Sequence, residues 1–260
     1  MEIHQISSQI YIMKDCVGSQ SVLVVGEEKA LVFDTCCGLE KLQSIIFSIT
    51  HLPLIVLASH GHFDHIGGSY QFDQVYISNK DRSILEKYDE ALLNNWLKEM
   101  SPTFDQTIDF GFPNWNQLVD INFDEFDLGN LKGNIVALPG HSLGSIGVFF
   151  PKLKLLLAGD ALAPIMCLNF DNHGTLKQQL DTLYHVAALD FDGFITGHSL
   201  MVYSKDVIHQ MIYCLENCRD QRFYQYQYPQ PPYSTGWFYL DYHEDIPIGL
   251  IVENKDDIDL

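Results

Sequence analysis

The sequence predicts an α/β protein whose β-sheets are covered on both faces. Short, continuously apolar segments such as residues 30–33 and 54–58 are typical of strands that are buried on both faces. Segments with helical spacing of apolar residues, such as 39–49, lie between them. Residues of metal-binding type follow the ends of several strands. A chain of 260 residues is long enough to fold as one large domain.

The first half of the chain is expected to alternate between strands and helices. Apolar runs predict strands, and apolar residues three or four positions apart predict helices. The expected strands are residues 10–13, 21–25, 30–33, 54–58 and 75–78. The expected helices are residues 39–49, 81–88 and 90–100.

The second half repeats part of this pattern. The expected strands are residues 117–121, 135–138, 145–150, 154–158 and 193–196, and the expected helices are residues 175–188 and 204–218. Residues 21–33 and 145–157 both run strand, polar turn, apolar strand, and each is closely followed by an aspartate, Asp34 or Asp160. This repeated pattern predicts two similar halves that face each other. No linker-like composition separates them, so residues 1–260 are expected to form a single domain.

Composition excludes several classes of function. The net charge of −19 repels phosphate backbones, which argues against nucleic acid as a partner. No apolar run approaches the roughly 20 residues that span a bilayer, so no membrane association is expected. The N-terminus lacks the basic start and apolar core of a secretory signal, and none of the six cysteines forms a Cys-x-x-Cys pair. We therefore expect a cytoplasmic protein with reduced thiols.

The most informative segment is residues 59–68, Ser-His-Gly-His-Phe-Asp-His-Ile-Gly-Gly. It holds four side chains able to bind a metal within six positions: His60, His62, Asp64 and His65. Imidazole and carboxylate groups are ligands of zinc, iron and manganese. The segment follows a buried strand directly, which is where open sheets commonly place their chemistry. A metal site is therefore predicted at this strand end.

Three later residues are candidates to complete the site, each at the end of an apolar strand. His141 follows residues 135–138, Asp160 follows 155–158, and His198 follows 194–196. A glycine stands immediately before each one and leaves space for a close backbone approach. The repetition of this strand, glycine and ligand arrangement favours one shared metal centre.

The order and spacing of these pieces resemble the metallo-β-lactamase superfamily, in its dinuclear glyoxalase II and lactonase-like branch. The resemblance covers residues 11–198 and is carried by Leu31–Thr35, His60-Gly-His62-Phe-Asp64-His65, Pro-Gly-His141-Ser-Leu-Gly, Leu-Ala-Gly-Asp160 and Gly-His198. It implies a four-layer αβ/βα sandwich, in which two mixed sheets are flanked by helices and two metals lie in a cleft at the sandwich edge.

The resemblance also implies a role for each candidate. His60, His62 and His141 would bind the first metal, Asp64, His65 and His198 the second, and Asp160 would bridge both. Asp34 would orient the ligand imidazoles, with a helix N-cap as its alternative role. The cofactors implied are two divalent ions, zinc being the first expectation and iron or manganese the alternatives.

The chemistry implied is hydrolysis of a small ester, thioester or lactone. Two divalent ions lower the pKa of a bridging water toward about 7, which supplies a hydroxide at neutral pH. One ion polarises the carbonyl, and the other stabilises the leaving group. The residues expected to act in catalysis are Asp160, which bridges, and Asp64, which would relay a proton to the leaving atom.

Other functions remain open at this point. A mononuclear iron enzyme that oxidises sulfur compounds, similar to a persulfide dioxygenase, would use His60, His141 and Asp160. Hydrolysis of a β-lactam or another amide is a second alternative, and a non-catalytic metal-binding module is a third. Ala163 stands where lactonases of the superfamily place a tyrosine, and few cations follow His198, which weakens a lactonase or a glutathione-binding interpretation.

Two segments depart from a minimal fold. Residues 79–116 are expected to form a lid insertion, whose Trp96, Phe104, Phe112 and Trp115 would line an apolar substrate pocket together with His173. The alternative is that these aromatics pack the helices onto the sandwich. Residues 222–260 form an aromatic C-terminal extension, which would pack over the domain or against a second subunit and so leaves a homodimer open.

Overall fold

A seven-stranded mixed sheet, here called sheet A, is built from the first half of the chain. The computed structural model describes residues 1–100, 115–219, 221–241 and 246–258. Neighbouring strands pair antiparallel from β1 to β4 and parallel from β4 to β7. The strands in spatial order are β1 (Glu2–Gln5), β2 (Ile10–Lys14), β3 (Gln20–Val25), β4 (Ala30–Phe33), β5 (Leu54–Leu57), β6 (Val75–Ile77) and β7 (Leu118–Asp120).

A six-stranded sheet, sheet B, comes from the second half. Its spatial order is β14-β13-β11-β10-β9-β8, and the β11 and β13 pair is parallel. The strands are β8 (Glu125–Asp127), β9 (Lys132–Ala137), β10 (Ile146–Phe150), β11 (Leu155–Gly159), β13 (Gly193–Thr196) and β14 (Val202–Ser204).

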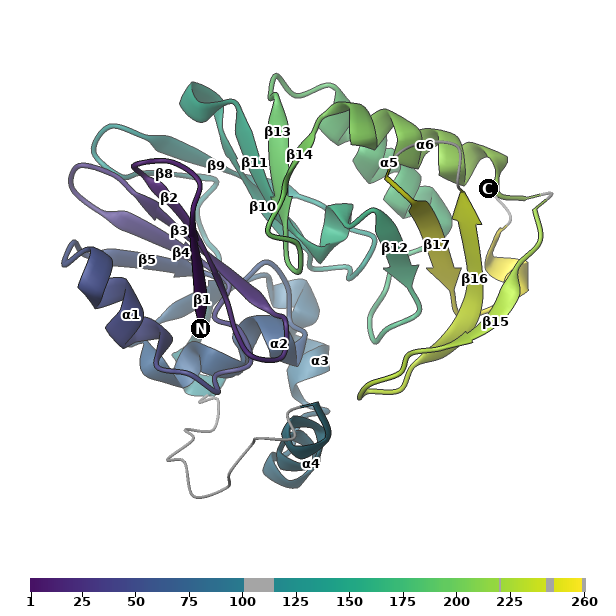
Figure 1. Cartoon of the computed structure of the whole chain (residues 1–260), viewed down its shortest axis with the longest axis horizontal. Coiled ribbons are helices and arrows are strands. Elements are labelled where there is room, and N and C mark those ends of the chain that lie inside the picture. Colours follow the sequence, from purple (N-terminus) through teal and green to yellow (C-terminus); the bar gives the residue numbers. More distant parts are fainter. Residues whose placement is uncertain (101–114, 220, 242–245, 259–260) are drawn as a thin grey trace.

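Helices cover the outer faces of the two sheets (Figure 1). The α-helices are α1 (Leu42–Ile49), α2 (Phe63–Ile66), α3 (Arg82–Leu85), α4 (Glu90–Met100), α5 (Leu176–Ala187) and α6 (Asp206–Asn217). Short 3-10 helices are η1 (Gly67–Gln71), η2 (Asn79–Asp81), η3 (Trp115–Gln117), η4 (Pro151–Leu153), η5 (Asp160–Leu162) and η6 (Lys255–Ile258).

The alternation of side chains along β4 explains why sheet A is buried on both faces. Leu31 and Phe33 point into an apolar core between the sheets, where they pack with Val148 and Leu157 of sheet B. Ala30 and Val32 point the other way, into a core shared with α1. Every residue of this strand is therefore apolar. The predicted α/β fold with helix-flanked mixed sheets is confirmed by this arrangement.

A third sheet, sheet C, was not predicted from the sequence. Its four strands, in the order β12-β17-β16-β15, lie beyond α5 and α6 (Figure 1), and residues such as Met166 and Leu250 share an apolar core with these helices. Residues 222–260 were expected to form an aromatic C-terminal extension, and no strand was predicted within them. The strands are β12 (Ile165–Leu168), β15 (Tyr224–Gln227), β16 (Thr235–Asp241) and β17 (Ile248–Val252).

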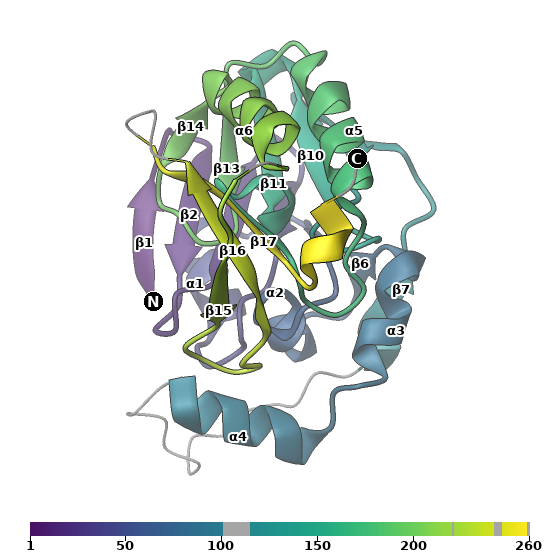
Figure 2. The ribbon, with the colours of Figure 1, turned by 90° about the vertical axis from the view of Figure 1, so that its right-hand side faces the viewer.

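Two predicted helices are shorter than expected. The helix predicted at 39–49 begins at Leu42, and the one predicted at 81–88 is reduced to η2 and α3. The predicted helix at 90–100 is α4, which lies at one end of the molecule (Figure 2). Across the described ranges, no helix combines the length and apolar character needed to cross a lipid bilayer.

Candidate metal centre

All seven predicted ligand residues lie where the strand ends of sheets A and B meet. His60 and His62 follow β5, Asp64 and His65 lie on α2, and His141, Asp160 and His198 follow β9, β11 and β13. The turn at Gly159 needs glycine, because its φ is +52° and a Cβ there would lie 2.5 Å from the Ser59 side chain. The fold thus brings residues 138 positions apart in the sequence to one place.

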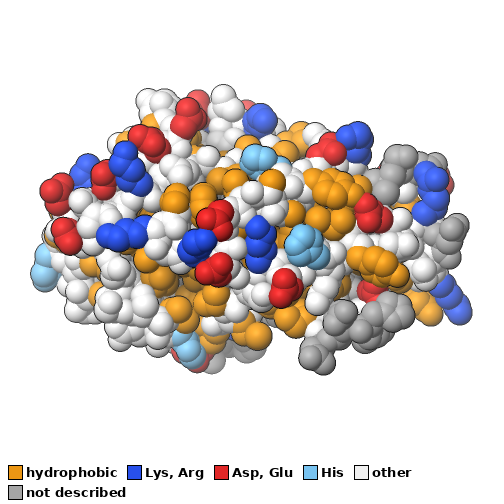
Figure 3. Space-filling view, turned by 90° about the horizontal axis from the view of Figure 1, so that it is seen from above, with side chains coloured by type: hydrophobic (Ala, Val, Ile, Leu, Met, Phe, Trp, Pro, Cys, Tyr) orange, Lys and Arg blue, Asp and Glu red, His pale blue; other side chains and the backbone are white. Residues whose placement is uncertain are grey.

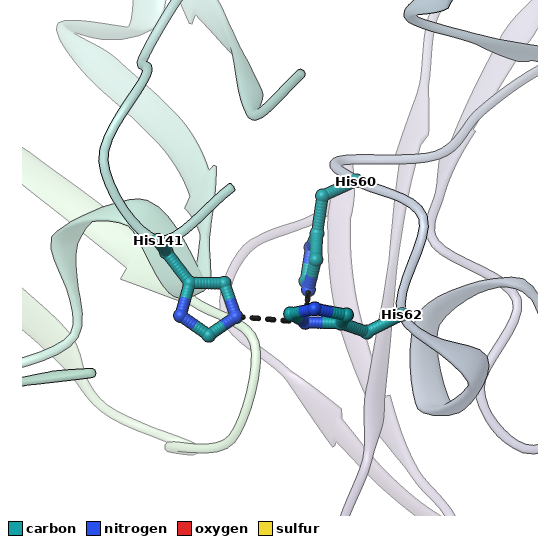
Figure 4. A group of neighbouring side chains, drawn as sticks. All are labelled: His60, His62 and His141. Atoms are coloured by element: carbon teal, nitrogen blue, oxygen red, sulfur yellow. Dashed lines mark hydrogen bonds between the residues drawn. The ribbon is translucent and has the colours of Figure 1, made fainter. Parts of the chain in front are cut away.

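Three histidines form the first group of possible ligands. His60 and His62 enter from one side and His141 from the other (Figure 4). The distance from His62 Nδ1 is 2.9 Å to His60 Nε2 and 3.0 Å to His141 Nε2. Two nitrogens bound tetrahedrally to one zinc ion at about 2.0–2.1 Å lie about 3.3 Å apart. The three nitrogens therefore converge at nearly the separation that one ion requires.

Asp64, His65 and His198 form the second group. His198 Nε2 lies 3.3 Å from Asp64 Oδ2, and His65 Nε2 lies 3.5 Å from the same oxygen. Asp160 lies between the two groups: its Oδ1 is 3.5 Å from His65 Nε2, and its Oδ2 is 3.1 Å from His198 Nε2 and 3.8 Å from His141 Nε2. One carboxylate therefore faces both sets of nitrogens.

Two buried polar atoms at this point, which lie 3.5 Å from each other, lack a hydrogen bond. Neither His65 Nε2 nor Asp160 Oδ1 has a hydrogen bond within the described residues. A buried polar group without a partner costs about 1–3 kcal/mol, so such atoms are rare outside functional sites. A divalent ion between the two groups would satisfy both atoms. The residues present therefore fit a metal centre that takes nitrogen and oxygen ligands.

Each imidazole is held by its second ring nitrogen, which points away from the cluster. When the inward nitrogen offers its lone pair, the outward N–H donates a hydrogen bond and fixes the ring. The acceptors are Ser59 Oγ for His60 (2.9 Å), the Asp171 carbonyl for His62 (3.2 Å), Asp34 Oδ2 for His65 (2.9 Å), the Cys167 carbonyl for His141 (3.0 Å) and the Gly18 carbonyl for His198 (3.3 Å).

Asp34 supports two of these histidines at once. Its Oδ2 accepts the His65 ring hydrogen bond and a 2.8 Å bond from the Ser59 hydroxyl, which in turn contacts His60. Its Oδ1 accepts a 2.6 Å bond from the Ser59 backbone N–H. Helix α1 is capped at Lys41, so Asp34 is not a helix N-cap. The orienting role that the sequence suggested for Asp34 stays a prediction.

The three-histidine group stays neutral at neutral pH. Burial lowers the pKa of His60, and the neighbouring imidazoles lower it further. Burial also lowers the pKa of His62. Burial and the neighbouring His62 imidazole together lower the pKa of His141 to about 4. Neutral imidazoles keep a free lone pair, which is the form that binds a metal.

Without a metal ion, the second group combines positively charged imidazoles with negatively charged carboxylates. Burial tends to lower the pKa of His65 and His198, but the carboxylates Asp64 and Asp160 outweigh it and raise both pKa values well above the ordinary range. Burial likewise opposes ionisation of Asp64 and Asp160, and the imidazoles outweigh it and lower both pKa values. A metal entering here must displace protons from the two imidazoles.

Comparison with known proteins decides the family. Residues 15–198 match the family described as the metallo-beta-lactamase superfamily. The chain belongs to this superfamily. That assignment confirms the resemblance seen in the sequence, and the matched range contains all seven candidate ligands.

Two curated superfamily members illustrate the relationship. The chain is 30% identical over 163 residues to the acyl-coenzyme A thioesterase MBLAC2 of Bos taurus, a match that covers 54% of this chain and 57% of that protein. It is 33% identical over 134 residues to the hydroxyacylglutathione hydrolase of Ectopseudomonas mendocina, which covers 52% of this chain and 42% of that one. The chain thus spans about half the length of these relatives.

A solved superfamily structure shows the same fold. The metallo-beta-lactamase from Pontibacter korlensis superposes with a TM-score of 0.60 at 19% identity, covering 83% of this chain and 99% of that one. At this identity the likeness concerns the fold alone.

The structure describes the side chains of two of the five predicted pocket residues, Trp96 and His173. Trp96 of α4 packs edge to face on Tyr88, with ring centroids 5.8 Å apart, and joins an apolar cluster with Phe63 beside the ligand turn. The Nε2 atom of His173 lies 3.3 Å from Oε2 of Glu253. Phe104, Phe112 and the Trp115 side chain lie outside the described part of the structure.

Aromatic residues that the sequence analysis did not select lie against the candidate ligands. The Phe170 ring packs edge to face on His62 and His141, with centroids 5.6 and 5.8 Å apart. Tyr228, next to β15, packs on Phe170 at 5.7 Å. Tyr228 lies beyond the range matched by the superfamily, so this contact is specific to the C-terminal part of this chain. Its only sequence signal was the aromatic richness of residues 222–242.

Proposed function

We propose that this chain is a hydrolase that holds two divalent metal ions, most simply zinc, and cleaves the acyl bond of a small thioester or a related ester or lactone. One observation carries the proposal: the Asp160 carboxylate faces three histidines from both ligand groups, at 3.1–3.8 Å. A single closed structural site would need no such shared carboxylate. The superfamily membership supports hydrolysis as the reaction class.

The residue roles in this proposal follow from the geometry. His60, His62 and His141 would hold the first ion, Asp64, His65 and His198 the second, and Asp160 would contact both. When bound, such ions polarise a carbonyl oxygen and activate water at neutral pH. Asp34 and Ser59 would keep the imidazole rings oriented while charge develops at the reacting centre.

Asp64 is the candidate for moving a proton. Its side chain is one-third exposed, whereas the other carboxylate of the centre, Asp160, is more deeply buried. Burial tends to raise its pKa, but the imidazoles of His65 and His198 outweigh this effect and lower it, so Asp64 is ionised at neutral pH. We propose that it takes the proton of the attacking water and delivers it to the leaving atom.

The walls of the centre favour an acyl group that is apolar. Phe170 and Tyr228 lie against the ligand rings, and Phe63, Tyr88 and Trp96 form an apolar cluster behind the ligand turn. Apolar walls with a few polar groups are typical of small-molecule sites. The printed activity of the relative MBLAC2, acyl-coenzyme A thioesterase, points to the same bond.

We also propose that α4 and the hairpin of β15 and β16 cover the centre from opposite sides. Tyr233 in the hairpin donates a hydrogen bond to Glu99 of α4, and Lys87 before α4 pairs with Asp171, whose carbonyl contacts His62. The described residues of the predicted lid insertion, 79–100, would then act as a cover, and residues 101–114 lie outside the described part of the structure.

The surface charge supports a small-molecule substrate in the cytoplasm rather than a polyanion. On the face seen from above, Lys and Arg side chains are interspersed with Asp and Glu and form no continuous basic field (Figure 3). With a net charge of −19, the chain offers little attraction for a phosphate backbone.

A substrate panel on the metal-loaded protein tests the proposal. The panel contains acyl thioesters of increasing chain length, aryl esters, lactones, a β-lactam and a persulfide. We expect the highest kcat/KM for an acyl thioester, with loss of activity after chelation and recovery on adding zinc. Oxygen consumption with the persulfide and an iron-loaded protein, without thioester cleavage, would instead support the sulfur-oxidising alternative.

A further inference from the structure

A buried aspartate outside the ligand set joins the loops that carry the three-histidine group. Asp81 ends η2 and its side chain is fully buried. Its Oδ2 accepts hydrogen bonds from the Gly61 N–H (2.9 Å) and the Ser142 hydroxyl (2.7 Å). Its Oδ1 accepts from the Gly144 N–H (2.9 Å) and the Asn172 amide (2.8 Å).

These four donors come from three separate loops. Gly61 lies between His60 and His62, and Ser142 follows His141 directly. Asn172 follows Asp171, whose carbonyl accepts the outward N–H of His62. Each loop therefore carries either a histidine of the first group or the residue that orients one. Asp81 has no hydrogen bond to the three histidines, so it positions them through the loops that carry them, and its negative charge also acts to raise the pKa of His62.

Two glycines, Gly61 and Gly144, pack closely against the Asp81 side chain, so the loops fit tightly around this carboxylate. A Cβ on Gly61 would lie 2.9 Å from Asp81 Cβ, and a Cβ on Gly144 would lie 2.4 Å from Asp81 Cγ. Neither position has room for a larger side chain unless the loops separate. A buried charge is costly unless its hydrogen bonds are satisfied, and here both oxygens accept two each.

We propose that Asp81 is a positioning residue for the first metal, one that sets the spacing of His60, His62 and His141. This inference rests on the proposed metal centre and goes beyond it. It names a carboxylate outside the ligand set that determines the geometry of one of the two ion sites. Asp34 differs from Asp81 in that it accepts a hydrogen bond from the His65 ring directly, and it reaches His60 of the first group through the Ser59 hydroxyl.

The variant Asp81→Asn tests the assignment. The amide keeps one accepting oxygen, but its NH₂ group must face two of the four donors whichever way it is turned. We expect the affinity for the first zinc site to fall about 10- to 100-fold, the range typical when a group behind a metal ligand is lost. At a free zinc concentration that gives two ions per wild-type chain, Asp81→Asn should hold about one, measured by competition with a chromophoric chelator.

Two further variants separate positioning from general stability. Asp15→Asn alters another buried carboxylate, which accepts the N–H groups of Val17, Gly18, Ser19 and Cys37 and contacts neither the 60–62 nor the 141–144 loop. It should lower the melting temperature of the metal-free protein but leave the affinity of the three-histidine site within about twofold. Ser142→Ala removes one of the four donors to Asp81, so it should weaken the same site by a smaller factor.

The outcomes distinguish this inference from the proposed function. If the wild type binds no zinc, the proposed metal centre itself fails. If the wild type binds two ions and Asp81→Asn binds both with unchanged affinity, only the inference is wrong. Equal losses at both sites in Asp81→Asn and Asp15→Asn would also overturn it, since that result describes a destabilised fold rather than a positioned site.

Discussion

At the scale of single residues, the proposed centre depends on imidazoles that are fixed at their outward ring nitrogens. In His60, His62 and His141 the inward nitrogens lie about 3 Å apart, and each outward nitrogen meets an oxygen. Because a ring held in this way cannot rotate, the lone pairs point to one place before any ion arrives. Such preorganisation reduces the reorganisation that metal binding and catalysis would otherwise require.

The first prediction concerns His62, whose Nδ1 is close to both other nitrogens of its group. His62→Ala removes a direct ligand, so thioester turnover should fall more than about 100-fold and one zinc ion per chain should be lost. His173→Ala is the matched control, because His173 turns toward Glu253 and should leave both measurements unchanged. Full turnover of His62→Ala at saturating substrate would refute the ligand assignment.

A second prediction concerns the cysteines. Burial raises the pKa of Cys214 to about 12 and of Cys218 to about 11, and burial with the charge of Asp160 raises that of Cys167 to about 12. Thiolates react and thiols do not, so these groups should be nearly inert at pH 8. Cys16 is exposed, and Ellman's reagent should modify about one thiol rapidly in the native protein.

The variant Cys16→Ser provides the control for this experiment, because it should remove the rapid phase. Modification of two or more thiols at the rate of Cys16 would show that the buried environment described for Cys167, Cys214 and Cys218 is wrong.

At the scale of secondary-structure elements, several candidate ligands could be placed from the sequence because they follow apolar strands. His60, His141 and Asp160 come after β5, β9 and β11, as the apolar runs predicted, and their role as ligands stays a prediction. Asp81 was missed, because its neighbours in the sequence look like the start of a helix and its partners are up to 91 positions away. A local pattern cannot reveal such contacts, and the same holds for Phe170 against His62.

Sheet C was missed for a similar reason. Its strand β12 pairs in parallel with β17, about 80 residues later, and no local signal links the two. Strands β15 and β16 are rich in polar and aromatic residues, and their side chains are mostly exposed or half-buried. They therefore lack the continuous apolar character that identified β4 and β11.

The hairpin of β15 and β16 provides the third prediction. Tyr228→Leu replaces the aromatic ring that packs on Phe170 with a smaller side chain. The kcat/KM for a long-chain acyl thioester should therefore fall about tenfold, or ~1.4 kcal/mol. An acetyl thioester does not reach this wall and should change less than about twofold. Tyr224→Leu is the control, because Tyr224 lies on the same hairpin and is 57% exposed. Equal effects on both substrates would contradict a role in acyl selection.

At the scale of the whole molecule, metal binding, protonation and stability are linked. The raised pKa values of His65 and His198 contribute stability to the metal-free protein that is fully present below about pH 6.5. That contribution is lost as the pH rises through the raised values. The same histidines must lose their protons to bind zinc, so zinc affinity has the opposite dependence and rises with pH.

The fourth prediction follows from this opposition. Zinc binding at pH 7 should release protons, which calorimetry in buffers of different ionisation enthalpy can count. Between pH 7 and pH 8, where the histidines with lowered pKa values are neutral in both the folded and the unfolded state, the melting temperature of the metal-free protein should fall, while the increase in melting temperature caused by a fixed zinc concentration should grow. Zinc binding without proton release would contradict the charge state described for His65 and His198.

Element quantification on the purified, zinc-reconstituted protein tests the central claim most directly. Because Asp160 faces two groups of ligands, we predict about two zinc ions per chain and about one in His198→Ala, which lacks a ligand of the second group only. A wild-type content of one ion per chain under saturating zinc would contradict the shared centre, and so would a His198→Ala variant that still holds two.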